Sequence, residues 1–301
     1  MKIKNIAVLS GNKTKVHDGV VHYVPEFKES KTNDGKPAKE IEQPAEIRTD
    51  INFYQGTISF KFKAASKETG VLLTWDKPNK GTEYAVGLSL QYKSFVIISN
   101  TTNEIATNGG LTQFKDNEEI SVRFEMLGSD AKLFINNILY CEQNLNLTLA
   151  PLSFRITSDS EVFLSDIHVE SIKPKLFVVM QFTDEFNALY KDVIFPVSED
   201  AGYEVIRADE FFSSTPILND IIRSIREASV IVADITPDNP NVFYEIGYAH
   251  AIQKPTILIC DKKRDKLPFD VSSFRTLFYE NSISGKSKIE LSLKKYLENI
   301  Q

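Results

Sequence analysis

The chain of 301 residues is poor in cysteine and histidine and has no long apolar segment. Its two cysteines, Cys141 and Cys260, lie in different halves, so neither half is able to close a disulfide of its own. The two cysteines and four histidines lack zinc-ligand spacing, and we expect neither a metal site nor a bound cofactor. No apolar run approaches the ~20 residues that cross a bilayer, and the first residues lack the apolar region of a signal peptide. These absences predict a cytoplasmic protein with no membrane partner.

Positive charge is also scarce, since the net charge is −6 and neither half carries a basic surface. We therefore expect no nucleic-acid partner. The run Lys262-Lys263-Arg264 lies between Asp261 and Asp265, which favours a solvated loop over a phosphate-binding track. With 42% hydrophobic and 25% charged residues the composition is that of a globular protein, and the length predicts two domains.

In residues 1–171 apolar and polar side chains alternate, which is the period of a half-buried strand. Residues 57–63 have this pattern, and Ile120, Val122 and Phe124 repeat it. Short turn sequences separate the runs, as at residues 108–110 and 128–130. Many short alternating strands without a helical stretch predict an all-β antiparallel jelly-roll sandwich.

The pattern changes after residues 171–175, a short polar segment with Pro174 that we expect to be a hinge. Strands and helices then alternate over residues 176–301, which predicts a Rossmann/flavodoxin-like parallel sheet with helices on both faces. Pro196 is expected to kink or shorten the first helix. The expected strands are 176–180, 203–207, 230–233, 256–260 and 276–279, and the expected helices are 186–197, 217–225, 240–252 and 288–300.

Ligands of such sheets lie beyond the carboxyl ends of the strands. The side chains that follow the predicted strands are Gln181 and Phe182, Asp209 and Glu210, Asp234, and Asp261. The helix after the third strand begins with Asp238-Asn239-Pro240-Asn241, an Asx residue followed by proline, which is a favourable helix start. Glu245 then falls in the second turn, close to the edge of the sheet where a ligand is expected.

The segment Asn239-Pro240-Asn241-Val242-Phe243-Tyr244-Glu245-Ile246-Gly247-Tyr248-Ala249-His250-Ala251, followed by Lys254-Pro255, resembles the nucleoside 2-deoxyribosyltransferase signature. The strand, acidic loop and helix with one glutamate also resemble TIR domains, several of which cleave the nicotinamide bond of NAD. This resemblance covers about residues 175–301. It implies that Glu245 is the nucleophile or stabilises an oxocarbenium ion, that Asp220 lies against the base, and that Asn241 lies on the approach to the glutamate. TIR-like chains of this kind occur among bacterial immune effectors, and the transferases complete their sites across subunits, which implies a homo-oligomer.

Breaking a C1′–N bond builds positive charge on the sugar, and a carboxylate on one face of the ring stabilises or captures it. We therefore expect Glu245 to be catalytic in an N-glycosidase that acts on NAD, a nucleoside or a nucleotide. Asp209 is placed to meet a ribose hydroxyl, and Arg207 to meet a phosphate. The substrate-binding candidates are Gln181, Phe182, Asp209, Asp220, Asp234 and Asn241.

The first half resembles the concanavalin A/laminin G-like jelly rolls in residues 56–62, 70–73, 84–88, 120–139 and 162–169. That group includes binders of sugars and of proteins, so the sandwich is expected to sense, target or assemble. Trp75 fits either a sugar-stacking position or the core. Asp116, Asn117 and Asp130 fit turns better than a calcium site.

Two other functions stay open. The α/β domain fits a non-catalytic receptor for a nucleotide signal, and it equally fits an oligomerising platform for a carbohydrate- or protein-binding sandwich. Each predicted site residue also has a structural explanation, such as a salt-bridged Glu245 or a helix-surface Asp220.

Overall fold

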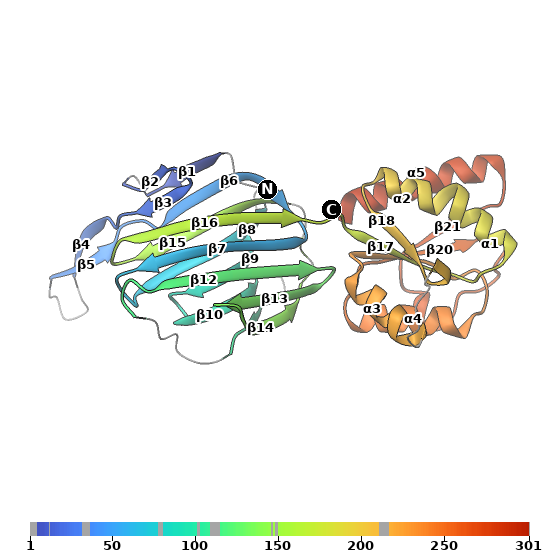
Figure 1. The fold of residues 1–301 in the computed structure, drawn as a ribbon. Helices are drawn as coiled ribbons and strands as arrows, with labels where there is room; N and C mark the ends of the chain where they lie inside the picture. The colour runs from blue at the N-terminus through green and yellow to red at the C-terminus, as the bar shows by residue number, and fades with distance from the viewer. Residues whose placement is uncertain are drawn as a thin grey trace. The chain divides into compact units, whose positions relative to one another are not determined.

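The computed structural model describes residues 5–11, 13–31, 37–77, 81–100, 103–108, 115–145, 147, 150–210 and 217–300 (Figure 1). The chain divides into two compact units. The first comprises Met1–Met126 and Asp130–Ser171, and the second comprises Leu127–Ser129 and Ile172–Gln301. Among the helices of the described residues, none combines the length and the apolar character that a membrane crossing requires.

The first unit consists of antiparallel strands. Their bounds are β1 (Ile6–Ser10), β2 (Lys15–His17), β3 (Val20–Tyr23), β4 (Phe27–Lys31), β5 (Pro37–Ile41), β6 (Ala45–Phe53), β7 (Gly56–Ala64), β8 (Thr69–Lys77), β9 (Gly81–Ser89), β10 (Ser94–Ser99), β11 (Glu104–Ala106), β12 (Glu119–Leu127), β13 (Asp130–Ile135), β14 (Ile138–Asn144), β15 (Ala150–Ser158) and β16 (Val162–Ser171). One sheet has the order β1-β6-β15-β8-β9-β10-β11 and the other β14-β13-β12-β7-β16-β3-β2, while β4 pairs with β5. The predicted antiparallel jelly-roll sandwich is confirmed.

Apolar and polar side chains alternate along the strands, and the apolar ones form the core between the two sheets. In β7 the side chains of Ile58, Phe60 and Phe62 are buried, while Lys61 and Lys63 alternate with them on the more exposed face. The ring of Phe60 meets that of Phe154 in the other sheet edge-on, with centroids 5.2 Å apart. Burying each such side chain stabilises the fold by about 2–3 kcal/mol.

Trp75 belongs to this core. Only 1% of its surface is exposed, and its indole packs between Phe53 and Phe124. A sugar-stacking role for Trp75 is therefore wrong. Asn117 forms a turn, with a φ of 62° and an N–H that donates to the carbonyl of Ala64.

The second unit is a five-stranded parallel sheet flanked by helices. Its strands are β17 (Lys175–Val179), β18 (Glu204–Arg207), β19 (Val230–Asp234), β20 (Thr256–Asp261) and β21 (Thr276–Tyr279). Its helical elements are α1 (Asp184–Leu189), η1 (Tyr190–Ile194), α2 (Phe195–Asp200), η2 (Ala208–Glu210), α3 (Ile217–Glu227), α4 (Pro240–Ala251), η3 (Phe269–Val271) and α5 (Ile283–Ile300). The strand order β18-β17-β19-β20-β21 is the flavodoxin-like order, which confirms the predicted α/β class.

Helices cover both faces of this sheet, with α3 and α4 on one face and α1, α2 and α5 on the other (Figure 1). Phe177, Ile231 and Leu258 face the first pair, and Val178, Val232 and Ile259 face the second group. Because both faces are covered, each central strand is apolar throughout, as the continuous apolar runs predicted.

Pro196 does not break the first helix. Residues 184–200 form one continuous helix in which η1 is a π-helical turn, with the N–H of Phe195 donating to the carbonyl of Tyr190. Pro196 has no N–H, so it is unable to form the backbone hydrogen bond that a regular helix has at its position. The wider π-helical turn directly before it accommodates this missing bond. The expected shortening is therefore wrong, since the helix continues past Pro196 to Asp200 with a local change in helix type.

Candidate functional site

The carboxyl ends of β17 and β19 form the point where the direction of strand progression reverses. Helices leave these two neighbouring strands toward opposite faces, and in this fold class ligands bind at such a point. The loops after the two strands are joined by a hydrogen bond of 3.4 Å from Nδ2 of Asn239 to Oε1 of Gln181. Gln181 is partly buried there, and Phe182 beside it is 48% exposed.

The start of α4 is set by local sequence. Asn239 is the N-cap, and its side-chain oxygen accepts a hydrogen bond of 3.0 Å from the N–H of Asn241. Pro240 occupies the first helical position, where its missing N–H costs nothing. This confirms the predicted helix start and fixes Glu245 in the second turn.

Glu245 lies at the margin of the buried face of α4. Val242, Ile246 and Ala249 point into the core. On one flank of the helix His250 stacks on Phe274 of the β20–β21 connection, with centroids 4.2 Å apart. Since Glu245 lies about 140° from His250 around the helix, it projects on the other flank, toward α3, which packs beside α4.

The carboxylate of Glu245 is partly buried and has no hydrogen-bond or ion-pair partner among the described residues. Burial alone raises its pKa to about 7. Desolvation disfavours the charged form, and no cation among the described residues offsets it. A carboxylate held in this condition is costly to the fold and is typical of groups kept for chemistry.

Asp209 and Arg207 are bound to each other. The guanidinium donates through Nε and Nη2 to the two carboxylate oxygens of Asp209, both at 2.6 Å, and through Nη1 to Oδ1 of Asn187 at 3.0 Å. It also lies over the ring of Tyr190, 4.0 Å from the centroid. Arg207 is buried, so the expected phosphate contact would require the guanidinium to leave these partners.

Asp220 and Asn241 differ in exposure. Asp220 is buried on α3 and accepts a hydrogen bond of 2.8 Å from Arg223, one turn further along. Asn241 is exposed at the first turn of α4. Asp220 belongs to α3, the helix that Glu245 faces, and Asn241 lies one turn before Glu245 on the same flank of α4.

Asp234 is fully buried at the end of β19. Its carboxylate accepts hydrogen bonds from the hydroxyl of Tyr279 at 2.9 Å and from the N–H of Thr236 at 2.7 Å. Desolvation raises its pKa to about 6, and the neighbouring charge of Asp261 adds to the rise, although the hydrogen bonds oppose it. The carboxylate of Asp234 is thus part of an internal hydrogen-bond network.

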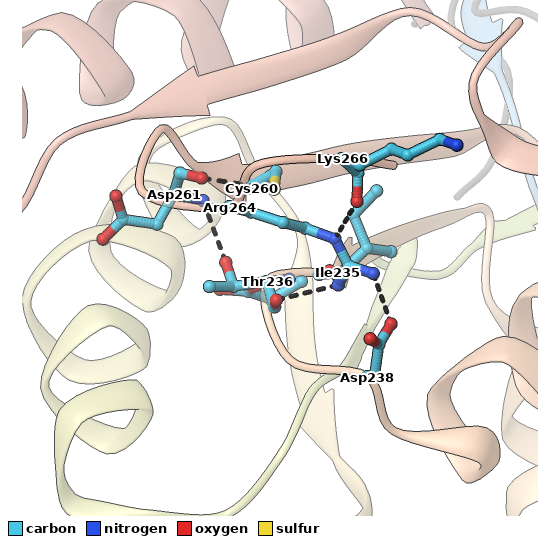
Figure 2. Close-up of polar contacts among 8 residues, drawn as sticks. Ile235, Thr236, Asp238, Cys260, Asp261, Arg264 and Lys266 are labelled. Carbon is cyan, nitrogen blue, oxygen red and sulfur yellow. Dashed lines mark hydrogen bonds and ion pairs between the residues drawn. The ribbon is translucent and has the colours of Figure 1, made fainter. Parts of the chain in front are cut away.

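Arg264 holds the loop that leads from β19 into α4 (Figure 2). Its guanidinium donates to the carbonyls of Ile235 and Thr236 and forms an ion pair with Asp238. Nε donates to the carbonyl of Lys266 at 2.9 Å, and the side chain is only 10% exposed. The expectation of a solvated loop holds for Lys262 and Lys263, which are exposed, but is wrong for Arg264.

No family model and no curated protein sequence matches the chain. Three solved structures with partial similarity to the chain are distant from it. The carbohydrate-binding module CBM66 from Bacillus subtilis is 10% identical with a TM-score of 0.35, and the match covers 48% of this chain and 92% of that one. Bacillus licheniformis beta-glucanase is 11% identical with a TM-score of 0.36, covering 54% and 92%. Chicken galectin 2 is 11% identical with a TM-score of 0.31, covering 41% and 97%. Similarity this weak assigns no activity and no ligand.

Sequence inspection missed two residues that organise this edge of the sheet. Tyr279 reaches Asp234, and Arg264 fixes the loop before α4. Neither gave a sequence signal, since both act over long sequence separations. Lys254, which follows the motif, lies at the opposite edge, just before β20, and its buried ammonium donates to the carbonyls of Arg226 and Ala228 at the end of α3. No cluster suited to a metal ion occurs among the described side chains.

Proposed function

We propose that the α/β domain cleaves the N-glycosidic bond of NAD, a nucleoside or a nucleotide, with Glu245 as the carboxylate that meets the anomeric carbon. One observation carries the proposal. Of the four predicted carboxylates in this region, Asp209, Asp220 and Asp234 are engaged by other side chains, whereas Glu245 is desolvated and unpartnered within the described chain. The resemblance of residues 239–251 to the deoxyribosyltransferase and TIR-like segments supports the same role.

The chemistry suits this environment. A desolvated carboxylate gains most when positive charge appears beside it, and the sugar becomes an oxocarbenium-like cation as the base departs. In NAD the bound nicotinamide ring is cationic and departs as the neutral base, which leaves the positive charge on the sugar. The bound substrate would therefore lower the pKa of Glu245 and favour its ionised form. Gln181, Asn241 and the exposed ring of Phe182 are available at the same edge to contact the base or the ribose.

The direct test is incubation of the full chain with NAD and with a panel of nucleosides and nucleotides, followed by chromatography for the free base. Release of one base that depends on Glu245 supports the proposal. Saturable binding measured by calorimetry without base release would instead favour the nucleotide-receptor hypothesis.

The pH profile is a second expectation. Only the ionised Glu245 is able to attack or to stabilise the cation, and its pKa is raised to about 7. We expect kcat/KM to rise with pH up to about pH 7 and to level off above it, because kcat/KM reports the free enzyme. Measurement of kcat/KM on the acid and alkaline sides checks this, and a flat or falling profile would contradict it.

A second candidate function, carbohydrate binding, rests on the outer face of the sheet that contains β15. Ser153 is 4% exposed, and within the part of the chain that the structure describes neither its Oγ nor the Nε of Arg155 has a hydrogen-bond partner. Both line a hollow of about 10 Å³ beside Arg48, and Arg155 also binds Glu46 at 2.8 Å. A hollow of that size takes one water or one hydroxyl, as an extended glycan lying on the sheet would supply.

An array of immobilised glycans probed with the full chain tests this second function. Arg155→Ala is expected to reduce binding at least about fivefold, since it removes one orphaned donor and the ion pair. Arg123→Ala, a partly exposed strand arginine in the other sheet, serves as the control and should bind normally. Equal loss in both variants, or no glycan bound, would count against a carbohydrate site.

A further inference from the structure

A cavity of about 270 Å³ lies on the opposite face of the α/β sheet from Glu245. Its walls come from one stripe of the helix formed by α1 and η1, and from the segment that joins β21 to the start of α5. The apolar part of the wall is made by Leu189, Val193, Tyr279 and Ile289. Nothing in the proposed N-glycosidase chemistry uses this cavity.

The charges around the cavity are unbalanced. Glu185 and Asp192, two turns apart on the same helical stripe, are exposed and have no side-chain partner among the described residues. Glu280 is already bound to Lys262 at 2.6 Å. The single lysine of the wall, Lys286, lies 3.9 Å from Glu290 on its own helix. Two carboxylates therefore remain without a counter-charge beside an apolar surface.

We propose that this cavity binds a small organic cation, an amine with a compact apolar or aromatic body. The ammonium group would lie between Glu185 and Asp192, and the body would pack on Leu189, Val193 and the ring of Tyr279. A volume of about 270 Å³ is just below the usual range for drug-sized ligands and suits a small amine. Phosphate-bearing ligands are disfavoured, because the net charge of the wall is negative.

Tyr279 connects the cavity to the loop that leads from β19 into α4. Its ring forms part of the wall, while its hydroxyl donates to Asp234 and contacts Thr236. Thr236 lies in the loop that leads to α4 and Glu245. A ligand that shifts Tyr279 is able to move this loop and so to alter base release. This effect on base release rests on the proposed function, whereas ligand binding in the cavity does not.

The test is calorimetry of the full chain with phenethylamine, phenylacetate and phenethyl alcohol, which share a body and differ in charge. We expect the amine to bind at millimolar concentration or tighter, the alcohol more weakly, and the carboxylate not at all. The double variant Glu185→Gln, Asp192→Asn should weaken amine binding about tenfold, as the loss of two partly solvated charges implies. Glu199→Gln, an exposed carboxylate on the same continuous helix outside the cavity, is the matched control.

Three outcomes would overturn the proposal. These are absence of saturable amine binding, equal binding of amine and carboxylate, and equal weakening by the control variant. Because all three replaced groups are exposed helix residues, loss of folding is not expected, and circular dichroism verifies this. The measurement contains no nucleotide, so its result does not depend on whether Glu245 is catalytic.

Discussion

Replacement of Glu245 by glutamine is expected to reduce base release by at least about 10³-fold, because the amide keeps the shape of the side chain but neither attacks nor stabilises a cation. Under the same conditions substrate binding should change much less than base release, since the carboxylate interacts most strongly with the positive charge that develops on the sugar as the bond breaks. The measurement is single-turnover base release at saturating substrate, with calorimetry for the dissociation constant. Glu298→Gln, an exposed glutamate on α5, is the matched control and should retain full activity.

The same substitution should make the protein more stable, which separates lost chemistry from lost folding. The pKa of Glu245 is raised from its ordinary value to about 7, so the folded state holds this proton more tightly than the unfolded chain does. Stability in the native protein therefore falls as pH rises from about 4.5 to about 7. At about pH 8 we expect Glu245→Gln to raise the free energy of unfolding by about 1–3 kcal/mol, and at about pH 4 to leave it unchanged.

Either result could contradict the assignment. Undiminished base release by the glutamine variant would remove Glu245 from the chemistry. A variant that is both inactive and less stable at about pH 8 would indicate that the carboxylate has a structural partner instead.

Arg264→Ala is expected to lower the free energy of unfolding by about 2–4 kcal/mol. The side chain donates to the carbonyls of Ile235 and Thr236 and pairs with Asp238 (Figure 2). Removing it leaves the buried carbonyl of Ile235 without this charge-assisted donor, and each such loss costs about 1–3 kcal/mol. Urea unfolding followed by circular dichroism measures the effect.

Two further variants show whether the geometry or the charge of Arg264 is responsible for the expected loss of stability. Arg264→Lys keeps the charge but replaces a planar fork by a single ammonium group, so it should recover less than half of the loss. Lys263→Ala removes an exposed neighbouring cation and should change stability by no more than about 0.5 kcal/mol. Similar urea-unfolding midpoints for Arg264→Ala and Lys263→Ala would show that the guanidinium contacts contribute little to the free energy of unfolding.

The fold was largely predictable because both classes of strand have distinct local patterns. Residues 57–63 alternate since one face of β7 is buried, and residues 176–180 are apolar throughout since β17 is covered on both faces. Element boundaries were less predictable. The last helix begins at Ile283, whereas the sequence predicted a start near residue 288. The sequence did not show the earlier start, because residues 284–288 are polar or glycine and carry no helical periodicity.

The candidate site was predictable in part. The sequence Asn239-Pro240 places the start of α4, and from it the position of Glu245, since capping is a local interaction. The partners of the other acids were not predictable. Asp209 lies two residues from Arg207 on the same segment, yet the two remained separate candidates because the burial of the arginine was not visible. The cavity between the α1–η1 helix and α5 had no sequence signal, because its walls are brought together only by the sheet.

The amino-acid sequence by itself determined the two architectures, the boundary region between them and the helix that carries Glu245. These depend on periodicity and capping, which act over a few residues. The tertiary structure decided which carboxylates of the candidate site are paired and left Glu245 without a partner among the described residues. Tyr279 reaches Asp234, and Arg264 reaches Ile235 and Asp238, across long stretches of chain. A carboxylate's charge state follows from such distant neighbours and from its burial, and both exist only once the sheet has formed.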